Sequence, residues 1–235
     1  MNIAVTNVPI WVSVLFFVSF STIPVFLIAN AAKEVLIRIG ENPLKIKKQI
    51  IVFYWSYFIV VGVIALSGFF SVNVIPPRII VYTAIPLLLF YLFIIPKKHW
   101  FQQIRKHITL EELIYIHVFR FVGVFFFVNY YYHALPKDFA FIGGAGDILI
   151  ALFAVPVIYF LKRKKSYAKT LAFIWNCIGL LDILSVITSA IIITKKSIEN
   201  NEIGVADFGT FPFCWIPAFA PATIIFLHLL IFRKL

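Results

Sequence analysis

Three charged side chains lie inside long apolar stretches of this sequence, namely Arg120, Asp147 and Asp182. A charge in the hydrocarbon of a bilayer is costly, so such residues usually turn inward and pair with one another. In helical geometry Asp182 falls near the centre of its stretch, with Arg120 and Asp147 roughly 5–6 Å to either side in depth. Pairing an arginine with carboxylates removes much of the cost of burial. We therefore expect one buried Arg/Asp cluster near mid-membrane.

The chemistry available to such a cluster is the binding of a proton or a cation. A carboxyl group in an apolar environment can take up a proton because desolvation disfavours its charged form. Ionisable residues at membrane depth occur in the ion pathways and proton relays of membrane proteins. The alternative is a structural ion-pair network that only fixes the register of the helices.

A second polar group is formed by His117, Asn176 and His228. Each lies about 8–10 Å from the centre of its stretch, toward the end that carries most of the Lys and Arg residues. Two histidines at matched depth are a possible pair of metal or haem ligands. The other three histidines fall in a loop or at the edge of a stretch, so the four ligands of a di-haem cytochrome are lacking. We therefore predict hydrogen-bonded histidines and no metal or cofactor.

The composition excludes a water-soluble fold. Of the 235 residues, 62% are hydrophobic and only 13% are charged, whereas about a quarter are charged in a soluble domain. The net charge of +11 would indicate nucleic-acid binding in a soluble protein. Here the cations lie in short loops, so we assign them to anionic lipid headgroups and predict no nucleic-acid partner. Cys177 and Cys214 are expected roughly 20 Å apart in depth, too far for a disulfide.

Seven apolar stretches approach or exceed the roughly 20 residues that a helix needs to cross a bilayer. They predict an all-α fold with a single transmembrane domain over residues 1–235. Because the loops are short, helices that follow one another in the chain should pack as neighbours. The predicted spans are residues 9–32, 50–70, 79–96, 113–135, 139–161, 170–193 and 212–231.

The loops alternate between high and low content of Lys and Arg. Sixteen of the 21 Lys and Arg residues lie in the first, third and fifth loops or after the seventh stretch. Four lie in the remaining loops, and the last is Arg120. Because cytoplasmic loops are enriched in Lys and Arg, the pattern predicts an N-terminus outside and a C-terminus in the cytoplasm.

Two local patterns predict helix faces. Four small residues share a helix face with Asp147, which suits close contact with another helix: Gly143, Gly144, Ala151 and Ala154. In the third loop, residues 99–111 have an amphipathic pattern. We expect a short helix there on the inner membrane surface, with Trp100 and Ile104 toward lipid.

The order of several short motifs resembles that of small bacterial integral membrane proteins of unassigned activity. The resemblance covers about the C-terminal half of the chain and supports the same candidate residues without naming a function. Its motifs are Arg120-x-x-Gly123, Leu135-Pro136-x-x-Phe139-Ala140, Gly144-x-Gly146-Asp147, Trp175-Asn176-x-x-Gly179-x-x-Asp182, Ile216-Pro217-x-Phe219 and His228-Leu229.

These patterns favour a small transporter or channel-like carrier in a bacterial inner membrane. In this hypothesis Asp147 and Asp182 bind a proton or a cation, and Arg120 balances their charge. One alternative is a membrane-embedded enzyme that acts on a lipid or isoprenoid, with an aspartate as general acid. Another is a non-catalytic subunit of a larger complex. We assign no catalytic residue, and take the lipid bilayer and a small-molecule or ion ligand as the expected partners.

Overall fold

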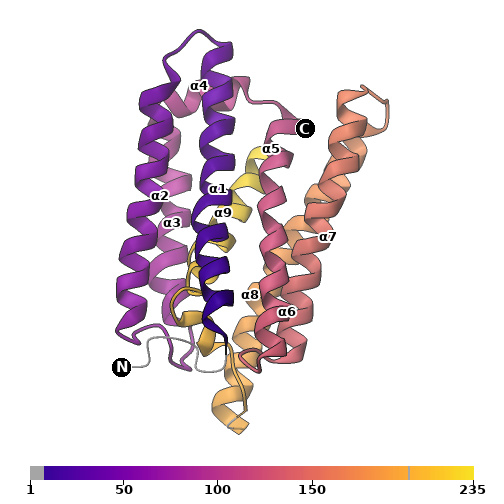
Figure 1. Cartoon of the computed structure of the whole chain (residues 1–235). Coiled ribbons are helices and arrows are strands. Elements are labelled where there is room, and N and C mark those ends of the chain that lie inside the picture. The colour runs from indigo at the N-terminus through magenta and orange to yellow at the C-terminus, as the bar shows by residue number, and fades with distance from the viewer. Residues whose placement is uncertain (1–7, 201) are drawn as a thin grey trace.

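The computed structural model describes residues 8–200 and 202–235, and in these the protein is all-helical. Seven helical segments of the described residues are long and apolar enough to cross a membrane. Figure 1 shows them as an upright bundle with short connections. The segments are α1 (Ile10–Arg38), α2 (Pro43–Leu66), Ile80–Lys97, Leu110–Tyr131, α7 (Lys137–Lys162), α8 (Ala168–Asn200) and α9 (Trp215–Phe232).

The seven segments correspond one to one with the predicted spans, and the differences lie at their ends. The first helix continues to Arg38 and the sixth to Asn200, because polar residues can extend a helix beyond the hydrocarbon. The second begins seven residues earlier than predicted, at Pro43. The Asn42 side chain accepts a hydrogen bond from the Leu44 amide at 3.1 Å and caps that end. Pro43 suits the first helical position because its missing amide hydrogen would have no partner there.

The last helix, α9, forms the centre of the bundle. Most of its residues are buried, whereas most residues of α8 are not. It contacts α2, α3, α5 and α8, and Figure 1 shows it in yellow between α1–α3 and α6–α8. Because α9 is apolar on all sides, it has no face that prefers water or headgroups. The helices that contact α9 therefore bury one face against it and leave another on the outside of the bundle.

The third and fourth spanning segments are irregular. The third consists of π-helical η1 (Ile80–Ala84), α3 (Ile85–Leu89), π-helical η2 (Phe90–Ile94) and 3₁₀-helical η3 (Ile95–Lys97). Pro86 and Pro96 lack an amide hydrogen, and such positions often coincide with π-type distortions. The fourth contains α5 (Leu110–Ile116), 3₁₀-helical η4 (His117–Gly123) and α6 (Val124–Tyr131). A seven-residue 3₁₀ segment is unusually long and tightens the chain around Arg120.

A short helix, α4 (His99–His107), crosses one end of the bundle. We expected Trp100 and Ile104 to face lipid, and this was wrong for Ile104, which is buried. Trp100 is half-buried and packs against the core. The apolar face of α4 turns toward the bundle because α1 lies directly beside it. Figure 1 shows the α1–α2 connection, α4, the α7–α8 connection and the C-terminus at this same end, which we call the basic end.

Candidate functional site

Arg120, Asp147 and Asp182 meet inside the bundle. Arg120 lies in η4 and is fully buried, with an exposed fraction of 0%. Its Nε donates a hydrogen bond to Oδ1 of Asp147 on α7 at 2.7 Å, and its Nη2 donates to Oδ2 of Asp182 on α8. The expected ion pairs are therefore present, and one guanidinium bridges two carboxylates from two helices.

The remaining contacts of the guanidinium extend the network to α9. Arg120 Nη1 donates to the carbonyl oxygen of Gly179 on α8 at 3.3 Å. The same nitrogen lies 3.5 Å from Nε2 of His228 on α9. Arginine carries five N–H donors in a rigid plane, which allows one side chain to hold several acceptors at once. Arg120 thus links η4 to α7, α8 and α9.

His228 is held by Asn176 on its other side. Nδ1 of His228 lies 2.7 Å from Oδ1 of Asn176, and Nδ2 of Asn176 donates to the carbonyl oxygen of His228 at 3.2 Å. The amide orientation makes Oδ1 an acceptor, so the imidazole hydrogen lies on Nδ1. Nε2 then presents a lone pair to Arg120, whereas a protonated ring would set two donors against each other. The geometry fits a neutral His228.

His117 completes the buried polar group but forms no hydrogen bond through its ring. Its ring centroid lies 4.3 Å from that of His228 and 5.2 Å from that of Trp175. Both ring nitrogens are buried and have no hydrogen-bond partner, which is rare for a polar side chain inside a protein. The expectation of a hydrogen-bonded histidine is thus met by His228 and wrong for His117. Within the described residues, no group of three His, Cys, Asp or Glu side chains is placed to hold a metal ion.

Glycines allow the helices to approach closely around this network. A Cβ atom at Gly123 would lie 2.7 Å from Cβ of Asp147, and one at Gly179 would lie 2.6 Å from Cε1 of His228. A Cβ atom at Gly146 would overlap the carboxylate of Asp182. These three glycines each lie one to three residues from a charged residue in sequence. A glycine within three residues of each charged residue is therefore the sequence pattern that could have predicted these close helix contacts.

Sequence reasoning separated two polar groups that the structure joins. The small-residue face of α7 is buried as expected, including Gly143 and Ala151. The depth estimate, however, placed His228 well away from Asp182, because it counted helix rise and ignored side-chain length. Arg120 reaches from one group to the other. All six candidate residues therefore form one network, which we call the Arg120 network: Arg120, Asp147, Asp182, Asn176, His117 and His228.

Exposure within the network is uneven. The side chain of Asp147 is 7% exposed and that of Asp182 is 13% exposed, against 0% for Arg120. Asp182 lies at the edge of the network, where α8 passes Gly146 of α7. Among the three charged side chains, Asp182 is therefore the one nearest to the outside of the bundle.

One family model matches this chain. It is described as Domain of unknown function (DUF8737), and it covers residues 74–235, more than half of the chain. The chain belongs to this family. The DUF8737 region begins before the third spanning segment and includes all six residues of the Arg120 network, whereas α1 and α2 precede it. No curated protein and no solved structure matches the chain.

Proposed function

We propose that this protein is a small membrane carrier whose Arg120 network takes up and releases one proton or one monovalent cation. The observation that carries the proposal is the charge of the network. One guanidinium faces two carboxylates, Asp147 and Asp182, and the neighbouring His228 is neutral. With both carboxylates ionised, the buried network holds one surplus negative charge.

A surplus charge in a low-dielectric interior costs several kcal/mol. One proton on a carboxylate, or one bound cation, removes that surplus and leaves a balanced pair. Binding and release therefore interconvert two states with different internal charge. Asp182 is the natural point of exchange because it is the most exposed of the three charged side chains. His117 lies beside His228 with unused ring nitrogens and offers a second proton acceptor.

The change in charge also acts on helix packing. An ionised Asp182 is held by Arg120 through a charge-assisted hydrogen bond, which is roughly twice as strong as a neutral one. A protonated Asp182 is held less firmly. Because Gly146 packs directly on this carboxylate, a weaker hold frees α8 to move against α7. This supplies the link between ion binding and helix movement that a carrier needs.

We place the N-terminus outside and the C-terminus in the cytoplasm of a bacterial inner membrane. The basic end in Figure 1 carries the connections that are rich in Lys and Arg, and such loops remain in the cytoplasm. Labelling with a membrane-impermeant maleimide tests this in a variant without Cys177 and Cys214. A cysteine at Lys164 should resist labelling in intact cells, and one at Lys137 should react. The reverse pattern would contradict the orientation.

Proton flux into proteoliposomes tests the function. Wild-type protein, with an internal pH dye and an imposed potassium-diffusion potential, should acidify the vesicles. Asp147→Asn and Asp182→Asn should each abolish the flux while the proteins remain folded in detergent. Asp138→Asn is the matched control, because Asp138 is an exposed carboxylate on the same helix as Asp147. Normal flux in both network variants would refute the proposal.

A structural role is the second candidate, and one observation favours it. Two cavities are found at the basic end of the described part of the chain, and neither reaches Arg120, Asp147 or Asp182. If the network serves only assembly, the wild-type protein should carry no proton flux. The asparagine variants should then differ from it only by a loss of stability. The same observation weighs against an enzyme with either aspartate as general acid, since neither faces these cavities.

A further inference from the structure

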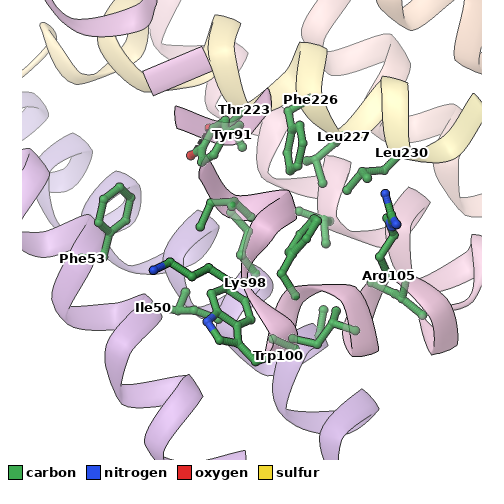
Figure 2. Close-up of a pocket in the computed structure, with 18 of the residues that line it drawn as sticks. Ile50, Phe53, Tyr91, Lys98, Trp100, Arg105, Thr223, Phe226, Leu227 and Leu230 are labelled. Carbon is green, nitrogen blue, oxygen red and sulfur yellow. Dashed lines mark hydrogen bonds between the residues drawn. The ribbon is translucent and has the colours of Figure 1, made fainter. Parts of the chain in front are cut away.

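A cavity of about 250 Å³ lies between α1, α2, the third spanning segment, α4, α5 and α9. Figure 2 shows its lining. The walls are aromatic and aliphatic side chains, of which Phe53, Phe101, Phe226 and Leu230 are examples. Cavities that are mostly apolar with a few convergent polar groups are the usual form of a small-molecule site. This cavity, which we call the basic-end chamber, is separate from the Arg120 network.

The mouth of the chamber is positively charged. Lys98 and Arg105 line it, and Figure 2 shows them on opposite sides of the apolar side chains. A second hollow of about 270 Å³ shares Arg105 and Leu230 with the chamber and adds Arg233 and Lys234. Arg105 therefore lines both cavities, and the second hollow places two further cations beside it. No Asp or Glu is among the residues that line either cavity, so these charges are not neutralised within the lining.

The inner end of the chamber is closed by hydroxyl groups that satisfy one another. The Tyr91 hydroxyl donates to that of Tyr54 at 3.0 Å and lies 3.1 Å from Oγ1 of Thr223. Because these hydroxyl groups already have hydrogen-bond partners, they do not require one from a ligand. Thr223 lies ten residues before Arg233, the residue that follows α9, so the inner end is about 15 Å deeper than this cation of the second hollow at 1.5 Å per residue. An apolar chain fits this space.

We propose that the chamber binds an anionic, phosphate-headed lipid, with one hydrocarbon chain inside and the head group at Lys98 and Arg105. The apolar walls match the chain, and the cations match the phosphate, which a guanidinium binds through paired donors. Basic pockets between helices at the cytoplasmic side of membranes bind anionic head groups in this way. The site goes beyond the proposed carrier function and does not depend on it.

The chamber and the Arg120 network share two walls. On α9, Leu227 lines the chamber and the adjacent His228 belongs to the network. On the fourth spanning segment, Ile116 lines the chamber and the adjacent His117 belongs to the network. A lipid in the chamber would therefore contact Leu227 and Ile116, which are adjacent in sequence to two residues of the network. Occupancy of one site is positioned to change the other.

Native mass spectrometry and thermal unfolding in a non-ionic detergent test the lipid site. Delipidated wild-type protein is titrated with phosphatidylglycerol, phosphatidylcholine and inorganic phosphate. We expect phosphatidylglycerol to bind and to raise the unfolding temperature, and the other two to bind at least about tenfold more weakly. Equal binding of phosphatidylcholine would overturn the anionic head group. Equal stabilisation by inorganic phosphate would overturn the lipid and leave a plain anion site.

Two variants separate the head-group contacts from the chain contacts. Lys98→Ala with Arg105→Ala should weaken phosphatidylglycerol binding roughly thirtyfold, since each surface cation contributes roughly fivefold to sixfold in affinity. Arg163→Ala with Lys165→Ala, in the basic α7–α8 connection outside the chamber, is the matched control and should bind normally. Ala31→Phe fills the chamber and leaves every cation in place.

The filled variant should lose binding of phosphatidylglycerol as well. Wild-type binding in both the filled and the cation variants would overturn the proposal. If Ala31→Phe does not fold, the comparison of the three ligands on wild-type protein still decides it. Lipid binding is measured without any proton flux, so failure of the lipid site and failure of the carrier proposal give different results.

Discussion

Nε2 of His228 lies 3.5 Å from Nη1 of Arg120, while the opposite ring nitrogen is bound by Asn176 at 2.7 Å. A neutral imidazole with its hydrogen on Nδ1 satisfies both neighbours. The charge of Arg120 is then balanced by the two aspartates alone. Asn176 thus determines which side of the histidine the arginine meets, although it does not touch the arginine.

Asn176→Leu should change the tautomer of His228. Without the amide oxygen, the hydrogen on Nδ1 loses its 2.7 Å acceptor, and only the longer 3.5 Å contact between Nε2 and Arg120 still favours that tautomer. The population with hydrogen on Nε2 should therefore rise. ¹⁵N spectra of protein labelled at histidine report the tautomer directly. Asn129→Leu is the matched control, since Asn129 is also a buried asparagine on a spanning helix and bonds only its own helix, at Phe125. An unchanged His228 tautomer in Asn176→Leu would contradict the assignment.

Arg120→Ala should destabilise the protein by about 3–5 kcal/mol, because two buried carboxylates lose their counter-charge. The loss should shrink when Asp147→Asn and Asp182→Asn are added, since the triple variant leaves no unpaired charge. Equilibrium unfolding in mixed micelles measures both values. A triple variant as unstable as the sum of its parts would show that the three residues do not act as a unit.

Gly146→Ala should disturb the contact between α7 and α8. The added methyl group overlaps the carboxylate of Asp182, so either this side chain turns away and loses its bond to Arg120 or the two helices move apart. Overpacking of this kind costs roughly 1–3 kcal/mol. The unfolding temperature should fall, and a Val155→Ala control on the exposed face of α7 should change it little. Equal unfolding temperatures of the two variants would contradict the contact between Gly146 and the carboxylate of Asp182.

Asp207 should make stability depend on pH. It lies in η5 (Ala206–Gly209), outside the spanning segments, and burial raises the pKa of its carboxyl group. The folded state therefore favours the protonated form more than the unfolded state does. Its stabilising contribution is full below the unfolded pKa and is lost as pH rises through the folded pKa. Asp207→Asn should remove this dependence, as judged by unfolding temperatures across acidic pH, whereas Asp138→Asn should retain it.

The number of spans and the meeting of Arg120 with two aspartates could be predicted because both follow from strong energetic penalties. Apolar stretches must be buried, and charges within them must pair. The irregular backbone of η4 could not be predicted, since nothing in residues 117–123 separates a 3₁₀ segment from an α-helix. The position of Ile104 was missed because an isolated amphipathic pattern does not show whether lipid or α1 covers it. The basic-end chamber was missed because its walls come from six segments far apart in the chain.

The central helix is synthesised after the six other spanning segments of the described residues. The segments that surround α9 enter the membrane before the helix against which they pack exists. Until Trp215–Phe232 arrives, Arg120 lacks His228 and the chamber lacks its inner wall. The final packing of the bundle therefore waits for α9, and it is not completed by successive pairs of neighbouring helices. A chain truncated before residue 215 would lack the helix against which α2, α3, α5 and α8 pack.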